Sequence, residues 1–259
     1  MFNEKALRQA LSDTPLSLSL FPTVDSTNSE ARRYALRGET LPALFLAEEQ
    51  SAGRGRMGRS FFSPMGTGIY LSLLLKTNDS LSDPITATTA AAVAVRRAIL
   101  SVTGISVEIK WVNDLYYGGK KICGILAESF FVGADRYLIV GVGINLSTVD
   151  FPQELRNKAG SLFSQETTLR ETLAAEVART LYEILTDGDP AIFMKEYRAA
   201  SLVLGKEITY LKNEIARCGI AESVDDLGRL LVRHSDGTTE LLASGEISLR
   251  INNEKGATE

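Results

Sequence analysis

The residues best suited to chemistry are three arginines in one seven-residue segment, Gly53 to Arg59. Arg54, Arg56 and Arg59 are permanently charged, and the segment contains no acidic residue. Its three glycines let the backbone approach a ligand closely, because glycine lacks a Cβ. Taken alone, such a segment is more often a solvated basic turn than a site. With that alternative open, the sequence predicts a loop that binds an anion, since guanidinium groups suit phosphate and carboxylate.

The same segment also satisfies the pattern G-x-G-x-x-G, through Gly53, Gly55 and Gly58. In dinucleotide-binding folds a helix begins directly after these glycines and holds the pyrophosphate. Here residues 59–66 contain two phenylalanines, a proline and a glycine, and the apolar run Ile69 to Leu75 follows. This order favours a loop and then a strand, which excludes the dinucleotide fold. No Gly-Lys-Ser/Thr follows the glycines either, so the loop is not of the Walker type.

Histidine and cysteine leave little room for other chemistry. His234 is the only histidine and lies beside Asp236-Gly237 in an expected turn, so we expect neither a histidine-based triad nor a multi-histidine metal site. Cys123 and Cys218 lack a metal-ligand spacing, and we expect reduced thiols in the core. The chemistry must then rest on arginine, lysine, carboxylates and the backbone.

Composition limits the class of protein. The 259 residues are 44% hydrophobic and 23% charged, with a net charge of −4, as is ordinary for a soluble globular protein. The negative balance argues against nucleic-acid binding through the overall field, so the arginine segment is a local device. Residues 1–9 do not resemble a signal peptide, and no run approaches the ~20 apolar residues of a membrane span. We expect a cytoplasmic protein with no membrane or nucleic-acid partner.

A second informative stretch runs from Lys110 to Leu126. Two apolar segments flank Gly118-Gly119, the pattern of a β-hairpin with a two-residue turn of the primed type. Such a hairpin can bring Asn113, Asp114 and Lys121 to one end of a sheet. A lysine beside a turn is usually only solvated. As a site residue, Lys121 would add a mobile point charge to the arginines, and together they suit a reaction that joins a carboxylate to a nucleotide phosphate.

The remaining pattern predicts the elements that position these stretches. Apolar periodicity predicts helices over residues 3–11, 31–36, 84–100, 171–185 and 190–200, and strands over 16–21, 43–47, 69–75, 107–111 and 136–140. We expect Pro22 to end the first strand. The polar residues 24–30 either cap the following helix or hold a polar ligand on its free amides. Residues 150–164 are predicted to be an irregular connection.

The chain changes character near its end. From residue 206 on, short β-rich runs at 207–210, 215–224, 230–234, 239–243 and 247–251 are separated by Asp and Gly, which is typical of a small β-barrel or sandwich. Residues 252–259 are predicted to be a frayed tail. We therefore expect two domains, residues 1–203 and 204–259.

Six segments together resemble the biotin protein ligase family, in that family's order. They are Asp25-Ser26-Thr27-Asn28, the run from Gln50 to Arg59, Lys110-Trp111-Val112-Asn113-Asp114, the run from Lys121 to Leu126, Gly141-Val142-Gly143-Ile144-Asn145, and the run from Gly245 to Leu249. The resemblance implies an α+β fold: a mixed-sheet catalytic domain of the biotin/lipoate ligase type, class II synthetase-like, and a C-terminal SH3-like β-barrel. It implies an ATP-dependent ligase that forms biotinyl-5′-AMP and then biotinylates a lysine of the biotin carboxyl carrier protein.

The resemblance also assigns site residues. Those that would bind biotin or the adenylate are Ser26, Thr27, Asn28, Gln50, Arg54, Gly55, Arg56, Lys121, Gly124 and Asn145. The arginine segment would order around the adenylate.

Four of the assigned residues would be catalytic, namely Arg54, Arg56, Lys121 and Asp114. Lys121 would contact the biotin carboxylate and the phosphate, and Asp114 would lie where the acceptor amine arrives. Asn145 would lie near the adenine. Mg²⁺ is expected with ATP, although the sequence shows no dedicated metal cage, and no metal ligands are assigned.

Two positions depart from the family pattern. Val112 replaces the usual proline, which we expect to change only backbone stiffness, and Ala159 falls where some members stack tryptophan on adenine. Only 25 residues precede Ser26, fewer than the ~50 of a small domain, so we expect no DNA-binding module. The resemblance also allows a homodimer paired through sheet edges.

Two alternatives to a biotin ligase stay open. One is a lipoate ligase or acyl transferase of related fold, and the arginine segment combined with the terminal β-module favours biotin over it. The other is a non-catalytic, biotin-responsive regulator. The presence of both loop arginines, Lys121 and Asp114 argues against that alternative.

Overall fold

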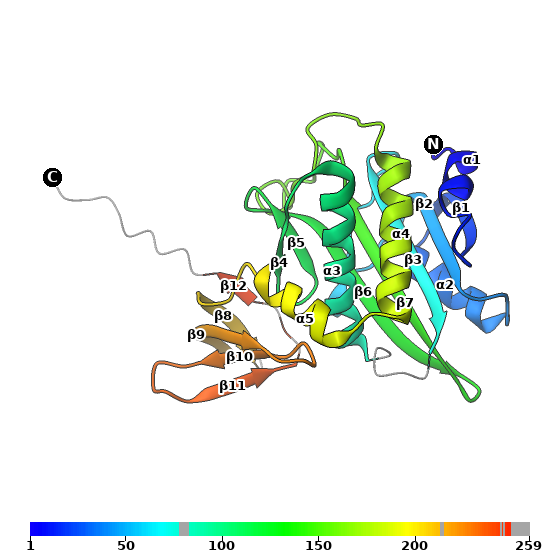
Figure 1. The fold of residues 1–259 in the computed structure, drawn as a ribbon. Coiled ribbons are helices and arrows are strands. Elements are labelled where there is room, and N and C mark those ends of the chain that lie inside the picture. The colour runs from blue at the N-terminus through cyan, green and yellow to red at the C-terminus, as the bar shows by residue number, and fades with distance from the viewer. Residues whose placement is uncertain (78–82, 213–214, 244, 246, 250–259) are drawn as a thin grey trace.

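The computed structural model describes residues 1–77, 83–212, 215–243, 245 and 247–249. These residues form a larger α+β part and a smaller C-terminal β part (Figure 1). The larger sheet has seven strands in the order β1-β2-β3-β7-β6-β5-β4. It is mixed, because β1 and β2 are parallel whereas the other neighbours are antiparallel. The predicted α+β class is confirmed.

The elements of the larger part follow the predicted order. Its strands are β1 (Ser17–Val24), β2 (Ala43–Gln50), β3 (Gly68–Lys76), β4 (Glu108–Lys110), β5 (Asp114–Tyr117), β6 (Lys120–Val132) and β7 (Asp135–Asn145). Its helices are α1 (Glu4–Ala10), α2 (Thr27–Leu36), the short 3₁₀ helix η1 (Arg56–Gly58), α3 (Pro84–Thr103), α4 (Arg170–Thr186) and α5 (Pro190–Ala199). The prediction for the first strand is wrong at Pro22, which lies inside β1. A proline is tolerated there because β1 is an edge strand with one neighbour.

Helices cover both faces of the larger sheet. On one face α3 and α4 lie side by side (Figure 1), packed on alternate strand residues such as Leu71 and Leu73. On the other face α2 packs its Tyr34 against Phe45 and Leu74. Helix α2 therefore covers part of this second face. The polar first residues of α2 lie directly against the sheet.

The helix α3 is the core of the larger part. By length and composition α3 could cross a membrane, with a mean hydropathy of 1.4 in its most apolar window. The expectation that no segment approaches the apolar length of a membrane span is therefore wrong for α3. Its run of alanines raises the mean hydropathy while allowing close packing, and 67% of the window is buried. Asp83 caps its first turn and Pro84 begins it, as predicted. We identify α3 as a buried core helix.

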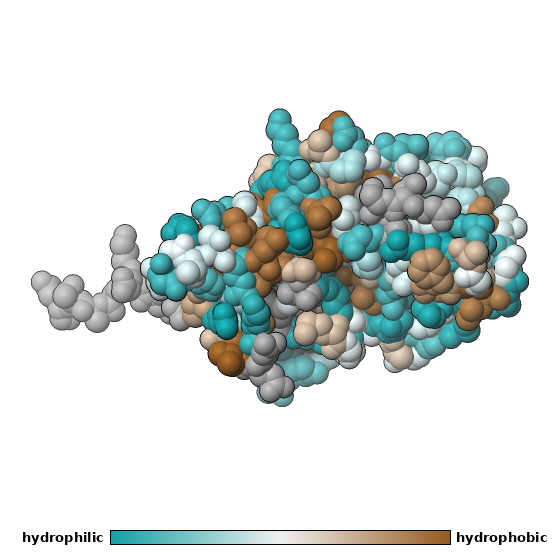
Figure 2. All heavy atoms as spheres, turned by 90° about the horizontal axis from the view of Figure 1, so that it is seen from below, coloured by the Kyte–Doolittle hydropathy of each residue, from teal (hydrophilic) through white to brown (hydrophobic). Residues whose placement is uncertain are grey.

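The C-terminal part is a five-stranded antiparallel sheet in the order β11-β10-β9-β8-β12. Its strands are β8 (Glu207–Lys212), β9 (Ile215–Val224), β10 (Leu230–Arg233), β11 (Thr239–Leu242) and β12 (Ile247–Leu249). Its buried apolar side chains belong to the same core cluster as those of α3. Apolar residues are also exposed at the surface where the two parts meet (Figure 2). The predicted β-module is confirmed. Residues 250–251 of its last predicted strand and the tail 252–259 lie outside the described residues, and the domain boundary at 203/204 stays a prediction.

A buried ion pair fastens α4 to the sheet. The guanidinium Nη1 of Arg170 donates to Glu48 Oε2 over 2.8 Å, and these side chains are 10% and 6% exposed. Arg170 Nε donates to the carbonyl of Gly68 at the start of β3. The ring of Phe2 lies 3.7 Å from the guanidinium of Arg170, and the backbone N–H of Phe2 donates to the Glu48 carboxylate. Four segments thus meet at one pair of charges.

Replacing one partner of this pair should be costly. In Glu48→Gln the Arg170 guanidinium stays buried without its carboxylate, and we expect the free energy of unfolding to fall by about 3–5 kcal/mol in urea titrations. The matched control is Glu196→Gln, which breaks the more exposed fork to Arg97 and should cost at most about 1 kcal/mol. A loss in Glu48→Gln no larger than in the control would contradict the structural role of the pair.

Candidate active site

A cavity of about 680 Å³ opens on the face of the larger sheet that carries α2. Its floor is made by β3, β6 and β7, and glycines keep the floor low. A Cβ added to Gly141 would lie 2.1 Å from Asn28 Oδ1, and one added to Gly143 would lie 2.5 Å from the Phe61 ring. These positions must be glycine for the neighbouring side chains to sit directly on the sheet.

The start of α2 forms an uncharged polar end of the cavity. Ser26, Thr27 and Asn28 are only 2–4% exposed and line it. The backbone N–H of Thr27 donates to Gln50 Oε1 over 2.8 Å, and its hydroxyl donates to the same oxygen over 3.2 Å. Ser72 Oγ lies 2.7 Å from the Thr27 hydroxyl and 2.6 Å from Asn28 Oδ1. These bonds preset the orientation of donors and acceptors for a polar, neutral group.

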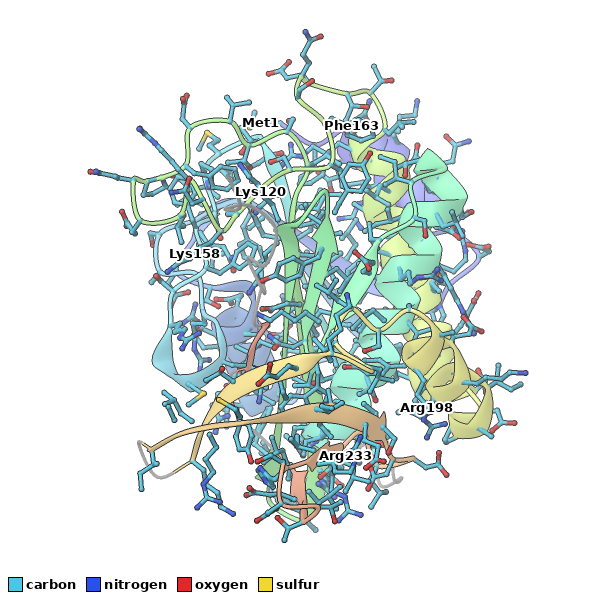
Figure 3. The ribbon with its side chains drawn as sticks, turned by 90° about the vertical axis from the view of Figure 1, so that its left-hand side faces the viewer. Met1, Lys120, Lys158, Phe163, Arg198 and Arg233 are labelled. Atoms are coloured by element: carbon cyan, nitrogen blue, oxygen red, sulfur yellow. The ribbon has the colours of Figure 1, made fainter. Side chains whose placement is uncertain are left out.

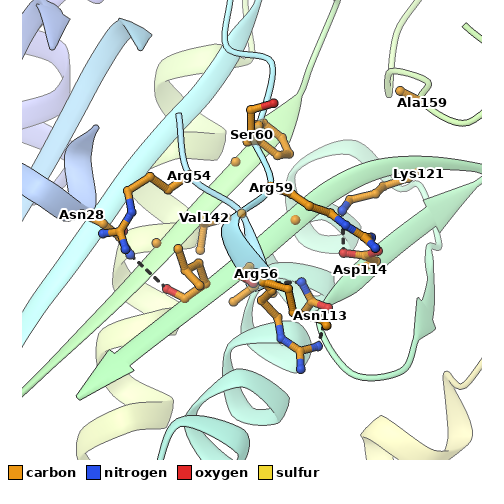
Figure 4. A pocket seen from close by; sticks show the side chains of 18 of the residues that line it. Asn28, Arg54, Arg56, Arg59, Ser60, Asn113, Asp114, Lys121, Val142 and Ala159 are labelled. Atoms are coloured by element: carbon orange, nitrogen blue, oxygen red, sulfur yellow. Dashed lines mark hydrogen bonds and ion pairs between the residues drawn. The ribbon is translucent and has the colours of Figure 1, made fainter. Parts of the chain in front are cut away.

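The predicted anion-binding segment folds back on itself over the cavity. Gly55 N donates to the carbonyl of Arg59 over 2.7 Å, and Phe61 N donates to the carbonyl of Gly53 over 2.8 Å. Residues 53–61 therefore form a narrow loop between β2 and β3, and the prediction of a loop followed by a strand is confirmed. Figure 4 shows the three arginines extending from this loop.

Arg54 and Arg56 contact residues across the cavity. Arg54 makes a two-pronged contact with Glu128, with N···O distances of 2.8 and 3.1 Å. Arg56 Nη1 donates to Asn113 Oδ1 over 3.1 Å. Burial lowers the pKa of Arg56, and the nearby carboxylate of Asp114 offsets part of that effect. A desolvated guanidinium whose main partner is a neutral amide favours an arriving anion.

The second predicted stretch forms the facing wall. Tyr117 pairs with Lys120 across Gly118-Gly119, whose φ angles of 56° and 76° belong to a primed turn, so the predicted hairpin is confirmed. At its base, Lys121 Nζ lies 2.7 Å from Asp114 Oδ1. Figure 4 shows this ion pair facing the arginine loop.

The turn between β4 and β5 is held from two sides. The indole N–H of Trp111 donates to the carbonyl of Gly228 over 2.9 Å, and the hydroxyl of Tyr197 donates to the carbonyl of Val112 over 3.0 Å. Gly228 belongs to the C-terminal part and Tyr197 to α5. Asn113, the partner of Arg56, therefore sits in a turn that is fixed by both parts of the chain.

The structure brings nearly all the predicted site residues together. Those that line the cavity are Ser26, Thr27, Asn28, Gln50, Arg54, Gly55, Arg56, Asp114, Lys121 and Gly124. Asn145 is placed beside the lining rather than on it: its Nδ2 donates to the carbonyl of Gly160 over 3.1 Å. Asn145 thereby supports the segment around Gly160. In this segment Ala159 lines the cavity and pairs with Lys121. The proximity of Asn145 to the adenine stays a prediction.

Sequence reasoning missed three residues near the site. Phe61 lines the cavity, and no pattern distinguished it from a core aromatic. Lys158 lines it from the irregular connection, which carries no periodic pattern, and lies near Lys120 in Figure 3. Glu128 follows Gly124 at even spacing on β6 and so points to the same face. Strand alternation was therefore a signal that could have found Glu128.

The charges of the lining define what the cavity can do. Among the described residues that line it, six are basic and one is acidic: Arg54, Arg56, Arg59, Lys110, Lys121 and Lys158 against Asp114. Such a lining offsets the repulsion between two anions, while the α2 end accepts a neutral polar group. Together with the fold, this lining suits a protein that joins a carboxylate to a nucleotide phosphate.

Comparisons with known proteins specify the family. Residues 20–145 match the Biotin/lipoate A/B protein ligase family, and residues 203–250 match the Biotin protein ligase C terminal domain. The chain is 30% identical to the Bifunctional ligase/repressor BirA of Escherichia coli, over 90% of this chain and 74% of that protein. It is also 30% identical to the Biotin--[acetyl-CoA-carboxylase] ligase of Mycobacterium tuberculosis, over 89% of this chain and 88% of that protein.

A solved structure agrees. Biotin protein ligase from Aquifex aeolicus, in complex with biotin and ATP, superposes with a TM-score of 0.73 at 26% identity, over 90% of this chain and 98% of that one. The chain belongs to the biotin protein ligase family and is an ATP-dependent ligase. The resemblance found in the sequence is thereby confirmed.

The glycine floor gives a direct test of the cavity. In Gly143→Ala the new methyl group meets the Phe61 ring, and overpacking of this kind costs about 1–3 kcal/mol. We expect the KM of the carboxylate substrate to rise at least fivefold with the fold retained, measured by initial rates and circular dichroism. A smaller residue at position 61, in Gly143→Ala/Phe61→Leu, should recover part of the loss relative to Phe61→Leu alone. An unchanged KM in Gly143→Ala would show that the ligand does not rest on this floor.

Proposed function

We propose that this ligase activates biotin with ATP in the cavity and transfers it to a lysine of the biotin carboxyl carrier protein. The observation that carries the proposal is the shared cavity, where the arginine loop and Lys121 face each other beside the uncharged polar end at α2. Biotin has a neutral bicyclic head and an anionic tail. It therefore matches a cavity whose two ends differ in the same way.

In the first step the head of biotin binds at the start of α2, where Ser26, Thr27, Asn28 and Gln50 present preset hydrogen-bonding groups. The biotin carboxylate oxygen attacks the α-phosphorus of ATP. The new O–P bond forms as the bond from the α-phosphorus to the bridging oxygen breaks, and pyrophosphate leaves. The loop arginines and Lys121 stabilise the charge that accumulates on the phosphoryl oxygens.

In the second step a lysine amine of the acceptor attacks the carbonyl carbon of biotinyl-5′-AMP. A C–N bond forms, the C–O bond to the phosphate breaks, and AMP leaves. The attacking nitrogen must lose a proton, and Asp114 is the carboxylate among the described lining residues that can accept it. Its ion pair with Lys121 holds it at the junction of the two substrates.

Magnesium fits this site as an ion that arrives with ATP. Mg²⁺ is commonly held by one or two carboxylates plus the substrate phosphates, and Asp114 would supply one carboxylate. When bound, the ion would neutralise phosphate charge.

We further propose a cytoplasmic location, which suits the two free cysteines. Pairing of two copies through a sheet edge stays a prediction.

Isotope exchange separates biotin from its nearest rival. Incubation with ATP and radiolabelled pyrophosphate should return label to ATP only when biotin is present, because exchange requires reversible adenylate formation. Lipoate serves as the parallel substrate. Exchange that depends on lipoate and is indifferent to biotin would replace this proposal with a lipoate ligase. Biotin binding with no exchange would favour a non-catalytic regulator.

The assigned charges can be tested with a neighbouring lysine as control. In Lys121→Met the chain loses the ammonium group at the junction but keeps the length of the side chain, and we expect the exchange rate to fall about 10²–10³-fold. Lys120→Met is the matched control, because Lys120 is the adjacent lysine and its Nζ donates to the carbonyl of Arg156 instead. The control should stay within about twofold of wild type. Equal rates in the two variants would remove Lys121 from the chemistry.

A further inference from the structure

Glu128 contacts both ends of the cavity although it does not line it. Its Oε2 accepts from Asn28 Nδ2 over 2.8 Å and from Arg54 Nη1 over 3.1 Å, and its Oε1 accepts from Arg54 Nη2 over 2.8 Å. Its side chain is 23% exposed. One carboxylate thus bridges the polar start of α2 and the arginine loop, which lie 26 residues apart in sequence at Asn28 and Arg54.

The register of the sheet places Glu128 at this junction. Gly124, Leu126 and Glu128 alternate along β6 and share the face that forms the cavity floor. Glu128 pairs with Ile139 of β7. Ile139 lies two residues before Gly141, and the Asn28 side chain packs directly on Gly141. The carboxylate therefore lies where the floor meets α2, held by backbone pairing rather than by a flexible loop.

Glu128 fixes which way the Asn28 amide points. Asn28 Nδ2 donates to the carbonyl of Leu126 and to Glu128, while Oδ1 lies 2.6 Å from Ser72 Oγ. A flipped amide would place its oxygen against the carbonyl and the carboxylate, so that acceptors face acceptors. The acceptor oxygen of Glu128, together with the carbonyl of Leu126, thereby selects the donor and acceptor pattern that Asn28 presents at the polar end of the cavity.

The same carboxylate sets the plane of the Arg54 guanidinium. Arginine carries five N–H donors in a rigid fork, and the contact with Glu128 uses two of them. The others stay available to a phosphate. The bonds from Gly55 N to Arg59 and from Phe61 N to Gly53 fix the loop backbone on both sides of Arg54, but the guanidinium lies at the end of a long side chain that these bonds do not orient. Glu128 supplies the missing constraint.

We propose that Glu128 is a positioning residue that couples the biotin end of the cavity to the nucleotide end, an inference that rests on the proposed function. A ligand that orders Asn28 also orders the shared carboxylate and with it Arg54. The second ligand then meets a partner that is already ordered, so each substrate raises the affinity for the other. Glu128 acts through Asn28 and Arg54 and touches neither substrate.

The variant Glu128→Gln distinguishes the two sides of the bridge. The amide oxygen of glutamine can take the place of Oε2, which accepts from Asn28 and Arg54 Nη1. Its Nε2 then faces Arg54 Nη2, where two donors oppose each other. We expect the Kd for biotin, measured by calorimetry, to stay within about twofold, and the KM for ATP in pyrophosphate exchange to rise about tenfold. The gain in biotin affinity caused by ATP should shrink by a similar factor.

Two further variants separate positioning from general stability. Glu196→Gln makes the same chemical change in another arginine fork, that of Arg97, outside the described lining, and both constants should match wild type. Arg54→Lys keeps the charge but loses the fork, so it should raise the KM for ATP as well. Adding Glu128→Gln to Arg54→Lys should then change that KM by less than about twofold, because the two-pronged contact that fixes the guanidinium plane is already gone.

Each other outcome overturns the inference. A lower KM for ATP in Glu128→Gln would mean that Glu128 restrains Arg54 rather than positions it. Equal changes in both constants together with a lower Tm would indicate a structural role only, and no change in either would remove Glu128 from the site. Wild-type protein that fails to bind biotin would instead overturn the proposed function, and this arm is measured first.

Discussion

Electrostatic repulsion between two anions is the constraint on which this structure depends. A carboxylate and a nucleotide phosphate come together only if cations surround their meeting point, and the cavity draws those cations from two separate elements. The arginine loop supplies guanidinium groups from one side, and the hairpin of β5 and β6 supplies Lys121 from the other. The cations would repel one another in turn, and three of them are held by partners of their own: Arg54 by Glu128, Arg56 by Asn113 and Lys121 by Asp114.

The scaffold brings these separately held charged side chains together in one site. Asn113 sits in a turn that α5 and the C-terminal sheet fix together, through Tyr197 and Trp111. The glycine floor lets α2 approach until its first residues contact the sheet, which gives the cavity its neutral end. The C-terminal part thus contributes to the site through packing, and its Ile247 also reaches the lining.

Features encoded locally could be predicted from the sequence. The arginine loop and the Gly118-Gly119 hairpin each depend on a few adjacent residues, and both have the expected form. Features that depend on register could not. Alternation from Gly124 indicates the face of β6 on which Glu128 lies, but its contacts with Asn28 and Arg54, like the contact of Asn145 with Gly160, join residues far apart in sequence. Pro22 is a similar case, because only the sheet order makes β1 an edge.

A crystal structure with bound biotinyl-5′-AMP tests the central claim most directly. We predict that the phosphate lies within about 3.2 Å of Lys121 Nζ and of a guanidinium nitrogen of Arg54 or Arg56, so that both elements hold the same group. A phosphate bound by the arginine loop alone, with Lys121 still paired to Asp114 and out of reach, would contradict the account.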